Sequence, residues 1–200
     1  MTSKVAILVS GSGTNMERLI RAFQGADDVD ICLVLCNKKG AGAIEKAAKL
    51  GVRTEVVPHT GFSSRSEFDA HLVERLRLAE IDWICLAGFM RVLTPEFIDA
   101  FPNRILNIHP SLLPAFPGLH AMRQALEYGV NVSGCTVHLV THEMDSGPIV
   151  AQAVVDVEVG ETESSLAKKI QAEEHRVYPE ALARVIRSSW HLEGRVFREA

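Results

Sequence analysis

Short apolar runs alternate with helix-like segments along this 200-residue chain, and this alternation constrains the fold more than any other feature. The early runs are nearly continuous in apolar residues, as expected of strands that are covered on both faces of a sheet. The expected strands cover residues 5–9, 31–36, 52–57, 83–87, 105–108, 135–140 and 149–155.

Helical patterns fill the intervals between these runs, over residues 15–23, over 43–50 and from Ser66 onward. A final helix is expected to begin after Thr162, and Pro179 is expected to kink or end it. Strands that alternate with helices indicate an α/β fold with a doubly wound, mainly parallel sheet of the Rossmann-like type.

Composition narrows the class of protein. The chain is 47% hydrophobic and 23% charged, which is typical of a soluble globular protein, and its net charge of −4 favours neither nucleic acid nor an anionic membrane. The first apolar run is too short for a signal peptide or a membrane span, so we expect a cytoplasmic protein. The cysteines lack zinc-ligand spacing and are expected to be small buried hydrophobes: Cys32, Cys36, Cys85 and Cys135.

A glycine-rich segment, Ser10 to Asn15, follows the first expected strand and opens a helix. Glycines let backbone N–H groups approach an anion, and a helix N-terminus adds partial positive charge, so a phosphate is the natural ligand. The alternative is a plain turn with a capping residue at Ser12 or Thr14. Met16 occupies the third glycine position of a dinucleotide fingerprint, so a monophosphate fits better than a nicotinamide cofactor.

Asn107 and His109 lie two apart at the end of an expected strand, so their side chains point the same way. Two converging donors can stabilise a developing oxyanion, and Pro110 and Pro114 stiffen the backbone that follows. The alternative is a turn with an incidental histidine. His138 is expected either to be structural or to support the site from behind.

A second loop, residues 144–148, places Asp145 after another expected strand. An aspartate in such a turn is usually a backbone cap, but Asp145 could also orient His109 and accept a proton through water. A Gly-x-Ser-x-Gly nucleophile motif is absent from the sequence, so these residues favour direct transfer between two substrates.

Taken together, these motifs resemble the glycinamide ribonucleotide formyltransferases of the bacterial single-function type. The resemblance extends from Val5 to about Pro179. Its markers are the segments 10–15, 86–91, 107–114, 117–118 and 145–148, with Glu174, His175, Tyr178 and Pro179.

The resemblance implies a role for each matching position. The implied catalytic residues are Asn107, His109 and Asp145. The implied ribonucleotide-binding residues are Gly13, Thr14, Asn15, Gln171 and Glu174. The implied folate-binding residues are Arg65, Met90, Arg91, Val92, Leu93, Asn107, Thr141, His142, Glu143, Met144 and Asp145.

The resemblance also implies the reaction. The amine of glycinamide ribonucleotide attacks the formyl carbon of 10-formyltetrahydrofolate, Asn107 and protonated His109 hold the oxyanion, and Asp145 relays the proton. We therefore expect one formyltransferase domain over residues 1–200, with the phosphate side in its N-terminal half and the folate side in its C-terminal half. We expect small-molecule substrates, no metal, no nicotinamide, no nucleic acid, no membrane, and a monomer or homodimer.

Three alternatives remain. Methionyl-tRNA formyltransferases share the Asn-x-His-Pro core, but they need a further C-terminal domain, and this acidic chain is expected to lack one. A formyltetrahydrofolate hydrolase shares the three catalytic positions, but it carries an N-terminal regulatory domain, which this chain is expected to lack because its first expected strand begins at Val5. A non-catalytic nucleotide-binding module would account for the glycine-rich segment but not for Asn107, His109 and Asp145 together.

Overall fold

The structure is a computed structural model that describes residues 2–199, and the chain divides into two compact units. The first unit ends at Leu106, and the second begins at Asn107. The glycine-rich segment therefore belongs to the first unit, and the three expected catalytic residues belong to the second.

Parallel strands in the order β3-β2-β1-β4 form the sheet of the first unit. Their bounds are Ser3–Val9 for β1, Val29–Cys36 for β2, Arg53–Val56 for β3 and Trp83–Leu86 for β4. The strand β1 lies between β2 and β4, and its residues 5–9 are fully buried. Ligands of such sheets bind at the carboxyl ends of strands where the strand order reverses, which is where the glycine-rich segment follows β1.

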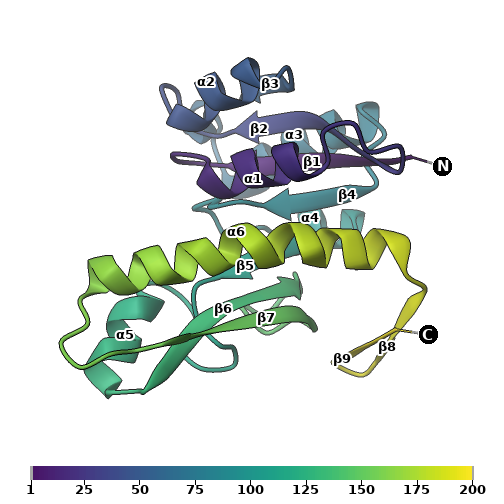
Figure 1. The fold of residues 1–200 in the computed structure, drawn as a ribbon. Coiled ribbons are helices and arrows are strands. Elements are labelled where there is room, and N and C mark those ends of the chain that lie inside the picture. Colours follow the sequence, from purple (N-terminus) through teal and green to yellow (C-terminus); the bar gives the residue numbers. More distant parts are fainter. Residues whose placement is uncertain (1, 200) are drawn as a thin grey trace. The chain divides into compact units, whose positions relative to one another are not determined.

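Helices lie on both faces of this sheet, with α1 and α2 in front of the strands in Figure 1 and α3 and α4 behind them. Their bounds are Thr14–Ala22 for α1, Gly42–Lys49 for α2, Arg65–Leu78 for α3 and Pro95–Ala100 for α4, with a short 3₁₀ turn at His59–Gly61. The doubly wound α/β arrangement predicted from the sequence is therefore confirmed. The sequence analysis did not predict α4, although Thr94 caps it by accepting a hydrogen bond from the backbone N–H of Phe97.

The second unit, which takes in β5 from Asn107 onward, combines parallel and antiparallel pairing, in the strand order β5-β6-β7-β9-β8. The strand bounds are Ile105–His109 for β5, Val132–Leu139 for β6, Ile149–Asp156 for β7, Trp190–Glu193 for β8 and Val196–Glu199 for β9. The pairs β6/β7 and β8/β9 are antiparallel, whereas β7 and β9 run parallel. The expected strands β5, β6 and β7 are confirmed, but the β8–β9 hairpin was not predicted.

The helix α5 (Ala121–Tyr128) precedes β6, and the long helix α6 (Glu163–Arg187) packs on β6 and β7. Thr162 caps α6 as expected, through a reciprocal pair of hydrogen bonds with Ser165. Of the two effects expected of Pro179, a kink or an end of the helix, the end is ruled out, because α6 continues to Arg187. Buried residues lie on both sides of the proline, so packing of the apolar face offsets the backbone hydrogen bond that proline cannot make.

The cysteines are free thiols, as expected, and lie in β2, β4 and β6. Three are buried, and Cys32 is half-buried. Burial, with a smaller effect of the Glu174 and Glu173 carboxylates, raises the pKa of the Cys135 thiol to about 12. Within residues 2–199, no helix is both long enough and apolar enough to cross a membrane.

Candidate active site

Asn107 and His109 lie at the carboxyl end of β5, and the alternation of a strand directs both side chains to one face. Asn107 is half-buried and His109 is 5% exposed. His138, on the neighbouring strand β6, joins them, because its Nε2 lies 3.2 Å from the Asn107 amide nitrogen Nδ2. The expected convergence of two polar side chains is therefore present, with a third group behind Asn107.

The contacts of the His138 ring favour one neutral tautomer. Its Nδ1 lies 3.0 Å from the backbone carbonyl of Leu139, so Nδ1 carries the proton and Nε2 accepts from the Asn107 amide. Burial lowers the pKa of His138, while the Leu139 carbonyl and the charge of Asp145 oppose that shift. His138 thereby orients the Asn107 amide, with its nitrogen toward the histidine.

His109 lies between two acceptors. Its Nδ1 is 3.4 Å from the carboxylate oxygen Oδ2 of Asp145, and its Nε2 is 2.9 Å from the backbone carbonyl of Phe116. An imidazole ring with N–H groups at both nitrogens could donate to both of these acceptors. The Asp145 carboxylate therefore lies beside His109, where the sequence analysis expected it.

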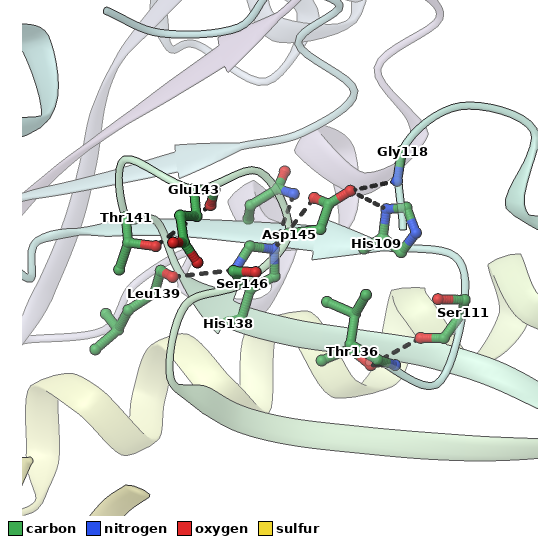
Figure 2. Close-up of polar contacts among 12 residues, drawn as sticks. His109, Ser111, Gly118, Thr136, His138, Leu139, Thr141, Glu143, Asp145 and Ser146 are labelled. Atoms are coloured by element: carbon green, nitrogen blue, oxygen red, sulfur yellow. Dashed lines mark hydrogen bonds and ion pairs between the residues drawn. The ribbon is translucent and has the colours of Figure 1, made fainter. Parts of the chain in front are cut away.

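Asp145 is central to the polar contacts in Figure 2. Its Oδ2 accepts a hydrogen bond of 2.8 Å from the backbone N–H of Gly118, in addition to facing His109. Its Oδ1 lies 3.7 Å from Nε2 of His138. The carboxylate is 10% exposed, so it acts on both histidines largely shielded from water.

The loop that carries Asp145 is held tightly at its base. The backbone N–H of Leu139 donates to the carbonyl of Pro148 at 2.9 Å. A Cβ atom at Gly147 would lie 1.7 Å from the Leu139 carbonyl oxygen, so only glycine fits there. Asp145 has a φ of 50°, in the left-handed region that aspartate and asparagine tolerate better than most residues.

The loop after His109 is tied to β6 and β7 by side chains that the sequence analysis did not single out. The hydroxyl of Thr136 donates to the carbonyl of Ser111 at 2.7 Å and accepts from the backbone N–H of Leu113 at 3.0 Å. Gln152 donates to both Thr136 Oγ1 and the Leu113 carbonyl. These contacts follow from the pairing of β6 with β7, which places Thr136 opposite Gln152.

The remaining expected residues of the second unit lie on the Asp145 loop and on α6. Thr141 is half-buried, and its hydroxyl donates to the Glu143 carbonyl at 3.3 Å. His142, Glu143 and Met144 are exposed. Gln171 and Glu174 are three residues apart on α6 and therefore share a helix face.

In the first unit, the glycine-rich segment forms a tight turn into α1. Gly13 caps the helix with a φ of 72° and without a side-chain hydrogen bond, so neither Ser12 nor Thr14 acts as the cap. Thr14 and Asn15 open the helix, and both are half-buried. Backbone N–H groups at the first turn of a helix are suited to bind an anion.

The expected folate stretch of the first unit begins beside the glycine-rich segment, because the backbone N–H of Met90 donates to Ser10 Oγ at 2.9 Å. Met90 and Val92 are exposed, whereas Leu93 belongs to the core. Arg91 lies over the Phe68 ring, 5.2 Å from its centre. Leu93 thus anchors the segment in the core, while the side chains of Met90 and Val92 are exposed to solvent.

Arg65 is exposed at the first position of α3, and Asp69, one turn later, is 1% exposed. Asp69 accepts a hydrogen bond of 2.7 Å from the backbone N–H of Thr94. Burial raises the pKa of Asp69, while the bonds from Thr94 and the charges of Arg91 and Arg65 oppose the shift. Asp69 thereby anchors the chain directly after the expected folate stretch.

Among residues 2–199, no group of three or more histidine, cysteine, aspartate or glutamate side chains could hold a metal ion. The groups that converge are instead amide, imidazole and carboxylate. This set can donate hydrogen bonds to an oxygen atom, supply positive charge beside it and accept a proton.

The sequence matches a family model described as formyl transferase over residues 3–182. The phosphoribosylglycinamide formyltransferase of Escherichia coli (strain K12) is 38% identical over 96% of this chain and 88% of that protein. The crystal structure of glycinamide ribonucleotide transformylase 1 from Symbiobacterium toebii has a TM-score of 0.96 at 46% identity, covering 99% of this chain and 94% of that one.

Other relatives are much longer than this chain. The trifunctional purine biosynthetic protein adenosine-3 of Drosophila pseudoobscura pseudoobscura is 42% identical over 98% of this chain, but the match covers 15% of that protein. The chain thus spans only a small part of the length of these multifunctional relatives.

Proposed function

Because this chain belongs to the formyl transferase family, we propose that it transfers the formyl group of 10-formyltetrahydrofolate to the amine of glycinamide ribonucleotide in purine biosynthesis. The convergence of Asn107, His109 and Asp145 within the second unit carries this proposal. The names of the Escherichia coli and Symbiobacterium toebii proteins support the choice of acceptor, since each matches nearly the whole chain.

Asn107 is the first donor to the formyl oxygen. His138 accepts one N–H of the amide, which fixes its plane and leaves the second N–H for the oxygen on which negative charge develops. A donor that is oriented beforehand stabilises that charge without reorganising during the reaction. Bound 10-formyltetrahydrofolate supplies the formyl group, and an amide and an imidazolium are suitable partners for its oxygen.

His109 supplies positive charge beside the same oxygen. In the structure, His109 Nε2 lies against the Phe116 carbonyl oxygen. For Nε2–H to donate to the formyl oxygen, its hydrogen bond to the Phe116 carbonyl must break. Asp145 keeps the opposite side of the ring paired throughout, through Nδ1. His109 therefore keeps its contact with Asp145 while its second hydrogen bond changes partner.

Asp145 is the proton acceptor in this proposal. The attacking amine must lose a proton, and the leaving folate nitrogen must gain one. Asp145 Oδ1, which lies 3.7 Å from His138 Nε2, would pass the proton between the two nitrogens through a water molecule.

Substrate binding is assigned to the residues that the family resemblance indicated. Gly13, Thr14 and Asn15 would hold the ribonucleotide phosphate, and Gln171 and Glu174 would contact the same substrate. The remaining set would bind the folate: Arg65, residues 90–93, Asn107 and residues 141–145. We further propose one formyltransferase domain, acting in the cytoplasm as a monomer or homodimer on small molecules.

The decisive test is mass-spectrometric detection of formylated glycinamide ribonucleotide, made by the purified full chain from 10-formyltetrahydrofolate. The chain should be treated with EDTA beforehand, and no nicotinamide should be added. Formate release without a formylated product would indicate a hydrolase instead. Binding of the ribonucleotide without turnover would indicate a non-catalytic module. Activity that returned only with one divalent metal would contradict the metal-free mechanism.

A further inference from the structure

The C-terminal hairpin formed by β8 and β9 is fixed to the end of α6, where Figure 1 shows it in yellow. Trp190 stacks on Phe197 with ring centres 5.1 Å apart, and the Trp190 indole N–H donates to the Val185 carbonyl at 2.9 Å. The Arg184 guanidinium lies over the Phe197 ring and pairs with Glu199 at 2.8 Å. The hairpin is thus an ordered extension of the second unit.

The turn of this hairpin contacts the loop that carries Asp145. Arg195 donates a hydrogen bond through Nη2 to the backbone carbonyl of Ser146, the residue after Asp145. The next residue, Val196, pairs with Ile149 at the start of β7. No carboxylate pairs with Arg195 in the described part of the chain, so the Ser146 carbonyl is the partner toward which its side chain is directed.

The Ser146 carbonyl is a sensitive point of the loop. The base of the loop is fixed where Gly147 and Pro148 meet Leu139, and the segment between this base and Asp145 on the C-terminal side is Ser146 alone. The orientation of the Ser146 carbonyl depends on the backbone torsion angles of Ser146. The same torsion angles set the position of Asp145 relative to Gly147 and Pro148. A contact that holds this carbonyl therefore also limits the position of the Asp145 carboxylate.

We propose that Arg195 is a positioning residue, by which the C-terminal hairpin holds the loop in the conformation where Asp145 reaches His109. The inference rests on the proposed function of Asp145. Arg195 acts through the Ser146 backbone and has no assigned contact with either substrate. Small displacements of a catalytic group can lower the rate strongly, so one exposed hydrogen bond at this place can affect turnover.

The test compares Arg195→Ala with Arg198→Ala in the full chain. Arg198 lies on the same hairpin and is also exposed, but its Nε donates to Glu193 within the hairpin. Arg198→Ala therefore removes the same charge without touching the Ser146 carbonyl. Arg195→Ala should lower kcat by about tenfold, through misplacement of Asp145, with an unchanged KM for glycinamide ribonucleotide. Arg195→Lys keeps a donor and should restore most of the lost kcat, while Arg198→Ala should match the parent.

A double-mutant cycle separates positioning from general stability. In an Asp145→Asn background, Arg195→Ala should have no further effect on kcat, because its effect passes through the Asp145 carboxylate. An equal loss in both backgrounds would overturn the proposal, and so would an Arg195→Ala variant as active as Arg198→Ala. A near-normal kcat for Asp145→Asn alone would instead refute the proposed function of Asp145.

Hydrogen–deuterium exchange gives a readout that needs no substrate. Peptides that cover residues 139–148 should exchange faster in Arg195→Ala than in Arg198→Ala, with peptides from α6 unchanged in both. Identical exchange over residues 139–148 in the two variants would overturn the proposal, even if activity differed.

Discussion

The carboxylate oxygen Oδ2 of Asp145 lies 3.4 Å from Nδ1 of His109 and also accepts the Gly118 backbone N–H at 2.8 Å. One oxygen therefore links the strand end that carries His109, the turn at Gly118 and the Asp145 loop. An uncharged side chain at position 145 could keep the backbone contact but not the electrostatic support of His109.

Asp145→Asn should lower kcat by orders of magnitude and leave the KM for the ribonucleotide nearly unchanged. Asparagine tolerates the left-handed backbone at this position, where φ is 50°, so the loop should keep its conformation. Steady-state kinetics with circular dichroism as the folding control would check this. A kcat close to that of the parent would show that Asp145 is only a turn residue.

Asn107→Ala and His109→Ala should each lower kcat by about 10²–10³, the usual cost of removing an oxyanion donor. Asn107→Asp is the sharper variant, because it keeps the shape of the side chain but has no N–H for His138 Nε2 or for the formyl oxygen. It should be no more active than Asn107→Ala. Full activity of Asn107→Asp would rule out a donor role.

Much of this site could be predicted from the sequence, because its residues follow strand ends. Asn107 and His109 share a face through the two-residue period of a strand, and Asp145 follows the next strand along the chain. The roles of His138 and Thr136 could not be predicted with the same detail. They depend on which strand lies beside β5 and on the register of β6 with β7, and neither is encoded in local periodicity.

The elements missed by the sequence analysis share a physical cause. The helix α4 has six residues, too few to show a helical period, and it is defined mainly by its Thr94 cap. The strands β8 and β9 have four residues each and expose most of their side chains. Their order comes from contacts with α6 and β7, which are distant in the sequence.

Burial of His138 gives a pH dependence of stability with a defined sign. Its pKa is lowered in the folded chain, so below its ordinary value of about 6.5 the unfolded chain binds a proton that the folded chain does not. The His138 contribution to the free energy of unfolding should therefore fall as the pH drops through this value. Urea unfolding from about pH 7 to about pH 5 should show a steeper loss in the parent than in His138→Gln.

The matched control is His191→Gln, which removes an imidazole whose side chain is 57% exposed. It should not reproduce the change in slope. If His138→Gln loses stability in parallel with the parent over this range, the histidine is not held neutral by burial. Asp145 faces the same ring, so Asp145→Asn should be measured beside it to separate the two groups.

The phosphate role of the glycine-rich segment is best tested at Gly11, not at Gly13. A Cβ atom at Gly13 would lie 2.7 Å from Ala43 Cβ, and its φ of 72° disfavours any side chain. Gly13→Ala should therefore destabilise the fold by about 2 kcal/mol or more, whether or not a phosphate binds there. A Cβ atom at Gly11 meets nothing within 4 Å, so Gly11→Ala should leave the free energy of unfolding almost unchanged.

The proposed phosphate site predicts that the anion, held by backbone N–H groups of the turn, lies in the open space beside Gly11. A methyl group there should displace the phosphate from at least one donor, and a hydrogen bond to a charged group contributes about 1.5–3 kcal/mol. The KM for glycinamide ribonucleotide should then rise by about tenfold or more, because 1.4 kcal/mol corresponds to a factor of ten. The KM for 10-formyltetrahydrofolate should change little. Equal changes in both KM values, in a variant as stable as the parent, would contradict a phosphate site at this turn.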